Sequence, residues 1–455
     1  MVVEKLPHHW LFEPVENLFF PYFVSAVVFH PAQGSGQNYR APYVQITLEY
    51  YERGKQHTIH RNIVQKDIKG RITVSQALEF LGLVRETAGL VKNQEAEVAK
   101  YNEHAPKTGE QYLAHGFGHD ASGSWHGNRI SFEKDGVFAK VVMDDVETEG
   151  RRGSDDASSP LVSAAFWNPK ESDDDDSEAD DKDMVVAPLH PTVKVFHLGE
   201  HVFATTHISN LEAYVYDEKL GAKLVLPVDH RELIDTLTGN AIRRMSDIIK
   251  GKATGIIILC SGAPGTGKTL TAEVYSEVAK RPLYMVQCSQ LGTDEVKIEQ
   301  TLQTVLARAV RWRAILLIDE ADVYVHERGD NLEQNAIVGV FLRLLEYFSG
   351  IMFLTTNRAT IVDDAIISRV TAHVRFEVPK DLDDKTELWN ILTAQYGLLG
   401  QLDVLECAKA FPDISGRSIR QLIRLAKFMA DRRKEKVTLK MLQWAAKYHD
   451  FTERS

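Results

Sequence analysis

The chain has 455 residues, of which 44% are hydrophobic and 26% are charged, and these proportions exclude a fibrous or wholly disordered protein. The net charge of −11 comes entirely from residues 144–183, which hold 15 acidic and 4 basic side chains. The rest of the chain is neutral, which argues against a strongly basic nucleic-acid-binding surface.

The N-terminal half alternates polar and apolar residues as strands do, and it contains one helical stretch near residues 74–100. We expect an α+β domain over residues 1–143 that binds a partner, and a β-rich continuation over 184–227. The acidic segment 144–183 between them is too polar to offset the entropy of ordering and predicts a disordered linker. An electrostatic docking tail is the alternative for that segment.

The pattern of apolar residues in the sequence changes at residue 228. Amphipathic helices now alternate with short apolar runs at residues 256–259, 283–286, 315–318 and 351–354. Buried strands that alternate with helices indicate a doubly wound parallel sheet over residues 228–378. Only helical periodicity follows, so residues 379–455 are predicted to form a small helical lid domain.

The sharpest motif is Gly262-Ala-Pro-Gly-Thr-Gly-Lys-Thr269, which follows an apolar strand and opens a predicted helix. Such a loop turns backbone N–H groups toward a phosphate at a helix N-terminus. Lys268 would reach the β- and γ-phosphates, and the Thr269 hydroxyl would bind Mg²⁺. An incidental glycine-rich turn is the plainer alternative. The residues expected to bind nucleotide here are Pro264, Gly265, Thr266, Gly267, Lys268 and Thr269.

A second motif, Ile315-Leu-Leu-Ile-Asp-Glu320, ends an apolar strand in two carboxylates. Ligands of open α/β sheets bind at this end of the strands. Asp319 would complete the Mg²⁺ site with Thr269, and Glu320 would orient the attacking water. A strand-to-helix turn capped by an aspartate is the alternative.

These motifs together with Leu354-Thr-Thr-Asn357 and a helical domain behind them resemble the AAA ATPases over residues 228–450. The segment 193–227 and the module after it are also similar to a little-characterised group of single-module AAA proteins best known from fungi. The resemblance implies ATP and Mg²⁺ as cofactors, and a P-loop NTPase fold with a C-terminal helical lid.

The resemblance also implies roles for polar residues outside the two motifs. Asn357 is similar to the sensor that contacts the γ-phosphate or the attacking water, although it could simply cap a turn. Arg369 is similar to the finger arginine that reaches a neighbouring subunit's γ-phosphate. Arg358 and Arg375 are rivals for that role, and a surface salt bridge is the alternative for Arg369.

Near the expected second sensor, the sequence offers both Arg417 and Arg420. They lie about one helical turn apart, so at least one of them could meet a phosphate. The sequence leaves open which one does, and a structural role for both is an equal alternative.

The chain departs from unfolding AAA members at the loop that lines their central pore. Residues 288–294 carry Leu291 and no aromatic side chain, which puts processive threading of a chain in doubt. The histidines at 115, 119 and 126 have ligand-like chemistry, but they lie in a Gly/Ser-rich stretch without paired cysteines, which favours ordinary loop histidines over a metal site.

We therefore predict a Mg²⁺-dependent ATPase that forms a ring, expected to be a hexamer, and remodels a protein client of unknown identity bound by residues 1–227. A nucleotide-gated assembly scaffold with slow turnover is the main alternative, and a clamp-loader-like DNA machine is a weaker one. Three unpaired cysteines and the lack of a signal-peptide pattern favour a cytoplasmic protein that binds neither membrane nor nucleic acid.

Overall fold

The computed structural model divides the chain into two compact units. The first comprises residues 1–108 and 112–213, and the second comprises 109–111 and 214–455. The structure describes residues 10–15, 18–33, 40–52, 55–64, 74–104, 107–120, 128–144, 188–239, 255–291, 295–325, 332–358 and 362–448. The predicted acidic linker lies outside the described residues except for Asp144, which is buried and whose N–H donates to the Lys194 oxygen over 3.1 Å.

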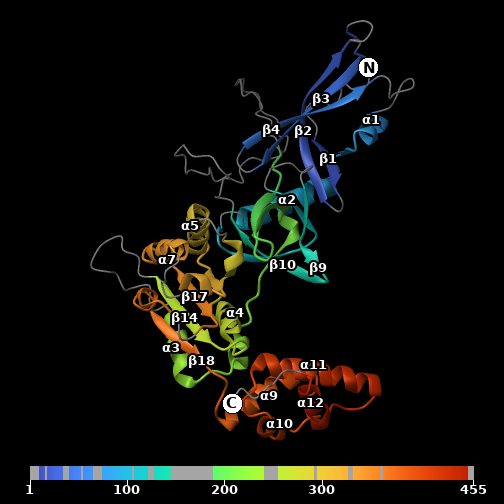
Figure 1. Cartoon of the computed structure of the whole chain (residues 1–455). Coiled ribbons are helices and arrows are strands. Elements are labelled where there is room, and N and C mark those ends of the chain that lie inside the picture. The colour runs from blue at the N-terminus through green and yellow to red at the C-terminus, as the bar shows by residue number, and fades with distance from the viewer. Residues whose placement is uncertain are drawn as a thin grey trace, which may run out of the picture. The chain divides into compact units, whose positions relative to one another are not determined.

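The first unit contains two antiparallel sheets, labelled in part in Figure 1. The first sheet has the order β4-β3-β2-β1-β5, and its strands are β1 (Trp10–Val15), β2 (Leu18–His30), β3 (Tyr43–Glu52), β4 (Lys55–Val64) and β5 (Val84–Arg85). The predicted helical stretch is in fact two helices, α1 (Val74–Phe80) and α2 (Ala88–His104), because β5 interrupts it to pair with β1. Leu11, Phe20 and Leu48 are among the side chains that fill the core on this sheet.

The second sheet joins the strands that precede the acidic segment to those that follow it. Its order is β13-β6-β10-β11-β12-β7-β8, with β9 paired to β10. Val141 of β10 pairs with His197 of β11, so residues 192–213 complete the sheet begun before the segment. The strands are β6 (Gln111–Ala114), β7 (Phe117–Asp120), β8 (Arg129–Ser131), β9 (Glu133–Lys134), β10 (Val137–Met143), β11 (Thr192–His197), β12 (Val202–His207) and β13 (Leu211–Ala213).

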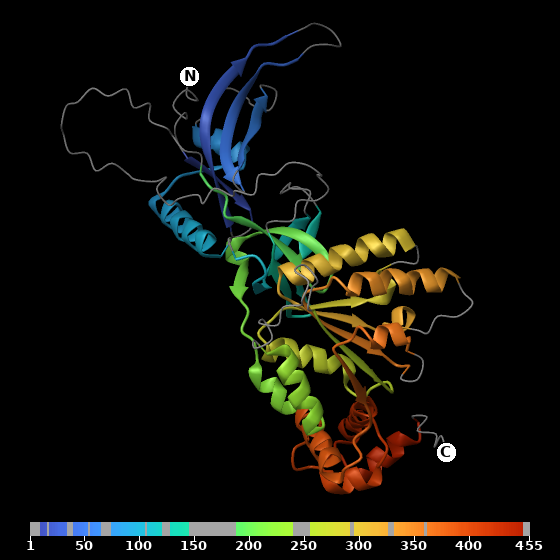
Figure 2. The same ribbon diagram turned by 90° about the vertical axis from the view of Figure 1, so that its left-hand side faces the viewer.

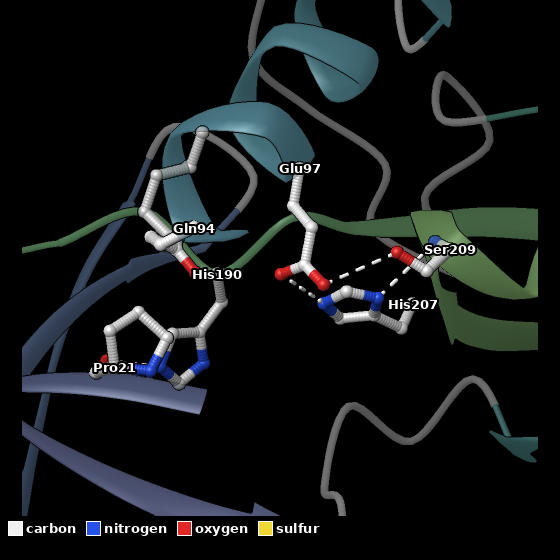
Figure 3. A network of polar contacts seen from close by, with 7 residues as sticks. Pro21, Gln94, Glu97, His190, His207 and Ser209 are labelled. Atoms are coloured by element: carbon white, nitrogen blue, oxygen red, sulfur yellow. Dashed lines mark hydrogen bonds and ion pairs between the residues drawn. The ribbon is translucent and has the colours of Figure 1, made fainter. Parts of the chain in front are cut away.

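A buried polar network fixes residues 189 and 190, which follow the acidic segment in the sequence (Figure 3). The Nε2 of His190 lies 2.7 Å from the Pro21 oxygen, and Gln94 Nε2 donates to the Leu189 oxygen over 2.6 Å. Close by, His207 Nε2 lies 3.4 Å from a carboxylate oxygen of Glu97. Burial lowers the pKa of His190 to about 3, so this imidazole is neutral in the folded protein at pH 7.

The second unit is built on a five-stranded parallel sheet with the order β15-β16-β17-β14-β18. Helices α3 and α4 cover one face of this sheet, and α5 and α7 cover the other (Figure 2). The strands are β14 (Ile256–Gly262), β15 (Leu283–Gln287), β16 (Ile315–Asp319), β17 (Ile351–Thr356) and β18 (Ala372–Phe376). The helices are α3 (Val228–Thr238), α4 (Lys268–Val278), α5 (Glu295–Arg311), α6 (Asp322–Val325), α7 (Leu332–Leu345) and α8 (Asp364–Ile367).

This sheet confirms the predicted P-loop α/β fold, and four of its strands cover the predicted apolar runs. The sequence did not predict β18. As the strand at one edge of the sheet, it alternates buried Val374 and Phe376 with an exposed Arg375, so it lacks the continuous apolar run that marked the inner strands.

The boundary between the units falls earlier than the sequence predicted. We assigned residues 184–227 to the N-terminal region, but the chain from Tyr214 onward belongs to the second unit. Leu220, Leu224 and Leu226 pack in the same apolar cluster as α4 and β14. The strand-like apolar residues of this segment therefore pack on the parallel sheet of the second unit rather than extending the N-terminal sheet.

The C-terminal lid consists of four helices that surround their own apolar core, seen at the red end of the chain in Figure 1. They are α9 (Leu382–Gln395), α10 (Val404–Ala410), α11 (Gly416–Arg433) and α12 (Leu439–Ala446). Trp389 and Leu422 are fully buried in that core. The first turn of α11, capped by the Ser415 hydroxyl, begins next to the phosphate loop described below.

Candidate nucleotide site

The loop between β14 and α4 is shaped by close contacts that only glycine permits. A Cβ on Gly262 would lie 2.1 Å from the Phe376 oxygen, and one on Gly265 would lie 2.6 Å from the Cβ of Arg417. Pro264 is exposed at the tip, and the Thr266 hydroxyl donates to the Ala263 oxygen over 2.8 Å. The loop thus folds tightly over the start of α4, as a phosphate-binding loop requires.

Lys268, the first residue of α4, is drawn back into this loop. Its Nζ donates to the carbonyl oxygens of Gly262 and Ala263, each over 2.8 Å, and the side chain is buried. Burial, and next the positive charge of Arg417, lower the pKa of Lys268. Two cations held close together, one of them buried, favour an anion beside them.

Thr269 and Asp319 meet at the ends of two elements that are far apart in the sequence. The Thr269 hydroxyl donates to Asp319 Oδ1 over 2.8 Å. The same oxygen accepts a second hydrogen bond, of 2.5 Å, from the hydroxyl of Thr355 on β17. A hydroxyl and a carboxylate in contact are oxygen ligands of the kind that Mg²⁺ prefers.

Glu320 follows Asp319 in a left-handed backbone conformation, with φ of 54°. This region is costly for a residue with a Cβ, and such conformations cluster at functional sites. The Glu320 N–H donates to the Thr355 hydroxyl over 3.0 Å, and its side chain is exposed at the end of β16. The backbone thus directs the Asp319 carboxylate toward Thr269 and the Glu320 carboxylate toward solvent.

Asn357 lies just after β17, beside the end of β16. Its backbone N–H donates to Asp322 Oδ1 over 3.2 Å, and the Thr356 hydroxyl donates to the same oxygen. The Asn357 side chain is exposed. Asp322, the first residue of α6, therefore joins the predicted sensor to the helix that follows Asp319 and Glu320.

Three residues that contact these groups were not identified from the sequence. Thr355 links β17 to β16, and Asp322 links α6 to β17. The Cys288 thiol lies 3.0 Å from the backbone oxygen of Glu320. Burial, and next the acidic neighbours beginning with Asp322, raise the pKa of Cys288 to about 12, so this thiol stays protonated. The paired threonines at the end of β17 were the available signal for Thr355.

The lid brings one of the two candidate arginines to the phosphate loop. The Arg417 N–H donates to the Gly265 oxygen over 3.4 Å. Arg420 lies one turn further along α11. Like Arg417 it is exposed, and its side chain makes no hydrogen bond or ion pair with any residue that the structure describes. The geometry favours Arg417 as the residue that could meet a phosphate.

Comparison with known proteins agrees with this arrangement. Residues 258–378, which run from β14 through β18, match the family described as "ATPase family associated with various cellular activities (AAA)". Residues 258–378 are an AAA-family ATPase domain. The ATP-dependent zinc metalloprotease FtsH 1 of Petrotoga mobilis is 26% identical over 245 residues. The mitochondrial sorting homolog of Caenorhabditis elegans is 29% identical over 179 residues.

These similarities cover only part of each protein. The two alignments cover 48% and 37% of this chain, and 37% and 52% of the respective relatives. The chain therefore matches about half or less of the length of these relatives. Within the described residues, no helix is long and apolar enough to cross a membrane.

Nothing in the described part of this chain supports a zinc site like the one named for the first relative. No group of three or more His, Cys, Asp or Glu side chains in those residues could hold a metal ion. The spacing of His197 and His201 resembles a zinc motif, but it falls on a turn between two strands, where His197 Nδ1 accepts hydrogen bonds from the N–H groups of Gly199 and Glu200. Among the loop histidines, His119 is buried on β7 and His126 lies outside the described residues.

Arg369 follows helix α8, and within the described residues its side chain makes no hydrogen bond or ion pair with the phosphate loop of its own chain. Its guanidinium donates to the Ala365 oxygen over 3.1 Å and lies 3.9 Å from a carboxylate oxygen of Glu346. Of its rivals, Arg358 follows β17 and Arg375 lies on β18, and both side chains are exposed. This position of Arg369 leaves it available to an adjacent molecule.

Leu291, which we placed on the pore loop, is buried with 1% of its surface exposed. Residues 288–290 form a short 3₁₀ turn, in which the Gln290 side chain accepts from the Gln287 N–H over 3.0 Å. The Leu291 N–H then donates to the Cys288 oxygen over 3.1 Å. Leu291 is therefore a core residue and not an exposed pore-loop side chain. Residues 292–294 lie outside the described part of the chain.

Proposed function

We propose that this protein hydrolyses ATP with the help of Mg²⁺ at the phosphate loop. The contact between Thr269 and Asp319, next to the buried ammonium of Lys268, is the observation that carries this proposal. Thr269 and Asp319 would hold the ion, which on binding supplies positive charge to the phosphate oxygens. Lys268 and Arg417 would bind the phosphates, Glu320 would orient the attacking water, and Asn357 would contact it or the γ-phosphate.

We further propose that copies of the chain assemble into a ring, expected to contain six, in which Arg369 completes the site of a neighbour. The absence of any contact between Arg369 and its own phosphate loop, within the described residues, supports this role. Nucleotide turnover would then depend on assembly. The work done would be remodelling of a protein bound by the N-terminal region, without processive threading.

A variant that holds ATP without cleaving it provides the test. Glu320→Gln should bind ATP as the parent does and lose on the order of 10²–10⁴ in turnover, whereas Lys268→Ala should not bind ATP. Proteins that co-purify with Glu320→Gln in the presence of ATP, and not with Lys268→Ala, are the candidate clients. Turnover by Glu320→Gln at the parental rate would refute the role of Glu320.

The same clients separate remodelling from the alternative of an assembly scaffold. A remodelling enzyme should hydrolyse ATP faster when the client is present, because the client's binding energy is coupled to turnover. A scaffold would bind ATP and assemble, yet show slow turnover that the client does not change. Client-independent, slow turnover would therefore favour the scaffold.

A further inference from the structure

The helix that starts at the phosphate loop ends on the segment that leads to the N-terminal unit. Glu277, one residue before the end of α4, is 7% exposed. One of its carboxylate oxygens accepts a 2.6 Å hydrogen bond from the Tyr214 hydroxyl, and the other accepts from the Asp217 N–H over 3.1 Å. Tyr214 is the first residue of the second unit after the chain leaves the first. We call residues 214–224 the connector. A buried carboxylate thus holds the start of the connector on α4.

Neighbouring contacts fix the rest of this connector on the same helix. Residues 218–223 form a 3₁₀ turn capped by Asp217, and Leu220 and Leu224 lie in the apolar cluster with α4. Beyond the helix end, Lys280 lies 2.7 Å from Glu218. The connector is therefore a packed part of the nucleotide-binding module and not a free linker.

A second passage of the chain is anchored on this module too. Residues 109–111 belong to the second unit although the chain on both sides belongs to the first. Gly109, with φ of +93°, lies so close to Trp312 that a Cβ would come within 2.9 Å of the Trp312 Cα. The Tyr214 N–H donates to the Gln111 oxygen over 3.2 Å, which joins the two passages.

Both anchors lead directly to the nucleotide site. Glu277 shares an 11-residue helix with Lys268 and Thr269. Trp312 is fully buried and lies just before β16, the strand that ends in Asp319. Because helices and buried strands move as rigid pieces, a shift of the phosphate loop would displace both passages together.

We propose that Glu277 is a positioning residue that couples nucleotide binding to the connector, through Tyr214 and Asp217, with the contact between Gly109 and Trp312 as a second anchor. This inference rests on the proposed ATP binding at the phosphate loop. Nucleotide binding further stabilises the packed connector and residues 109–111 beside it, and the signal reaches the N-terminal unit along these two chain segments. Loss of the Glu277 carboxylate leaves nucleotide binding intact and uncouples the connector.

Amide hydrogen exchange of the full-length chain tests the coupling. In a Glu320→Gln background, exchange of peptides covering residues 109–111 and 214–223 should slow by about fivefold or more when ATP and Mg²⁺ are added. Glu277→Ala and the milder Tyr214→Phe should abolish most of this difference, and Glu277→Gln should keep part of it because an amide oxygen can still accept. Glu273→Gln, an exposed carboxylate on the same helix, should leave the difference unchanged.

The readouts distinguish the failure of each proposal. ATP affinity is measured on every variant by equilibrium titration, and we expect Glu277→Ala and Tyr214→Phe to bind ATP within about threefold of their background. If the Glu320→Gln background itself does not bind ATP, the proposed function fails. If it binds ATP and connector exchange does not respond, or if the response survives in both Glu277→Ala and Tyr214→Phe, the coupling inference is overturned.

Discussion

The backbone N–H of Arg417 donates to the carbonyl oxygen of Gly265, so the first turn of α11 lies directly on the phosphate loop. The two residues are close enough that Gly265 has no room for a side chain. This contact separates two arginines that the sequence presented as equivalent. It also explains why Arg417 contributes to the lowered pKa of Lys268.

The first prediction compares these two arginines. Arg417→Ala should weaken ATP binding by about tenfold or more, since a charge-assisted hydrogen bond to phosphate contributes about 1.5–3 kcal/mol. Arg420→Ala is the matched control on the next turn and should change the dissociation constant little. Equilibrium titration with a fluorescent ATP analogue gives both constants. A larger effect for Arg420→Ala would reverse the assignment.

A second prediction concerns the base of the phosphate loop. Gly262→Ala should destabilise the nucleotide-binding module by about 3 kcal/mol, because the new methyl group overlaps the Phe376 backbone oxygen. Gly339→Ala in α7 is the control, since nothing lies within 4 Å of its added Cβ, and it should stabilise by up to about 1 kcal/mol. Thermal unfolding of each variant measures both effects. Equal midpoints for the two would contradict the close approach at Gly262.

The sequence was sufficient for groups whose neighbours are set by local motifs. Lys268 and Thr269 lie in one motif, and Asp319 ends a strand whose apolar run shows that it is buried. The motif and the common edge of a parallel sheet were therefore enough to predict that these residues lie close together. The choice between Arg417 and Arg420 was out of reach, because it depends on how a separate helical domain meets that loop. Leu291 was misplaced for a related reason: the turn at residues 288–290 directs it inward, and no periodic pattern reveals that turn.

The third prediction tests whether Arg369 acts on a neighbouring molecule. Arg369→Ala should bind ATP normally and lose on the order of 10³ in turnover, as expected for an arginine finger. Mixing it with excess Lys268→Ala should restore some activity, because one partner supplies the finger and the other the intact phosphate loop. ATPase assays over a range of protein concentrations measure this rescue. Turnover that is independent of concentration and is not rescued would indicate a monomeric ATPase.

The fourth prediction follows from the buried imidazole of His190 in the first unit. Its folded pKa of about 3 lies below the unfolded value of about 6.5, so on acidification the unfolded chain takes up a proton first. The contribution of the neutral His190 side chain to the free energy of unfolding is fully present above pH 6.5. It is lost as the pH falls toward 3, at up to about 1.4 kcal/mol per pH unit.

His190→Gln removes this titration, while its side-chain amide can still donate to the Pro21 oxygen. The variant should therefore lose stability less steeply than the parent between pH 6.5 and 4.5. Urea unfolding of the first unit is detected through hydrogen exchange of peptides from β2 and β11, which gives a midpoint for this unit alone. The neighbouring titratable groups His57, His207 and Glu97 are the same in both proteins, so only His190 can make the two pH profiles differ. Parallel profiles would therefore show that His190 is not the titrating group.

The last prediction separates packing from threading at Leu291. Because this side chain is buried, Leu291→Ala should destabilise the module by about 2–5 kcal/mol, the usual cost of such a cavity. A loss of ATPase activity in this variant would then reflect folding rather than grip on a substrate, and the thermal midpoint should fall in parallel. Leu291→Met nearly conserves volume and should retain most of the stability. Threading is tested instead on the parent, with a stably folded tagged protein: we expect ATP-dependent remodelling without unfolding of the tagged domain, and its global unfolding would contradict the proposed mode of action.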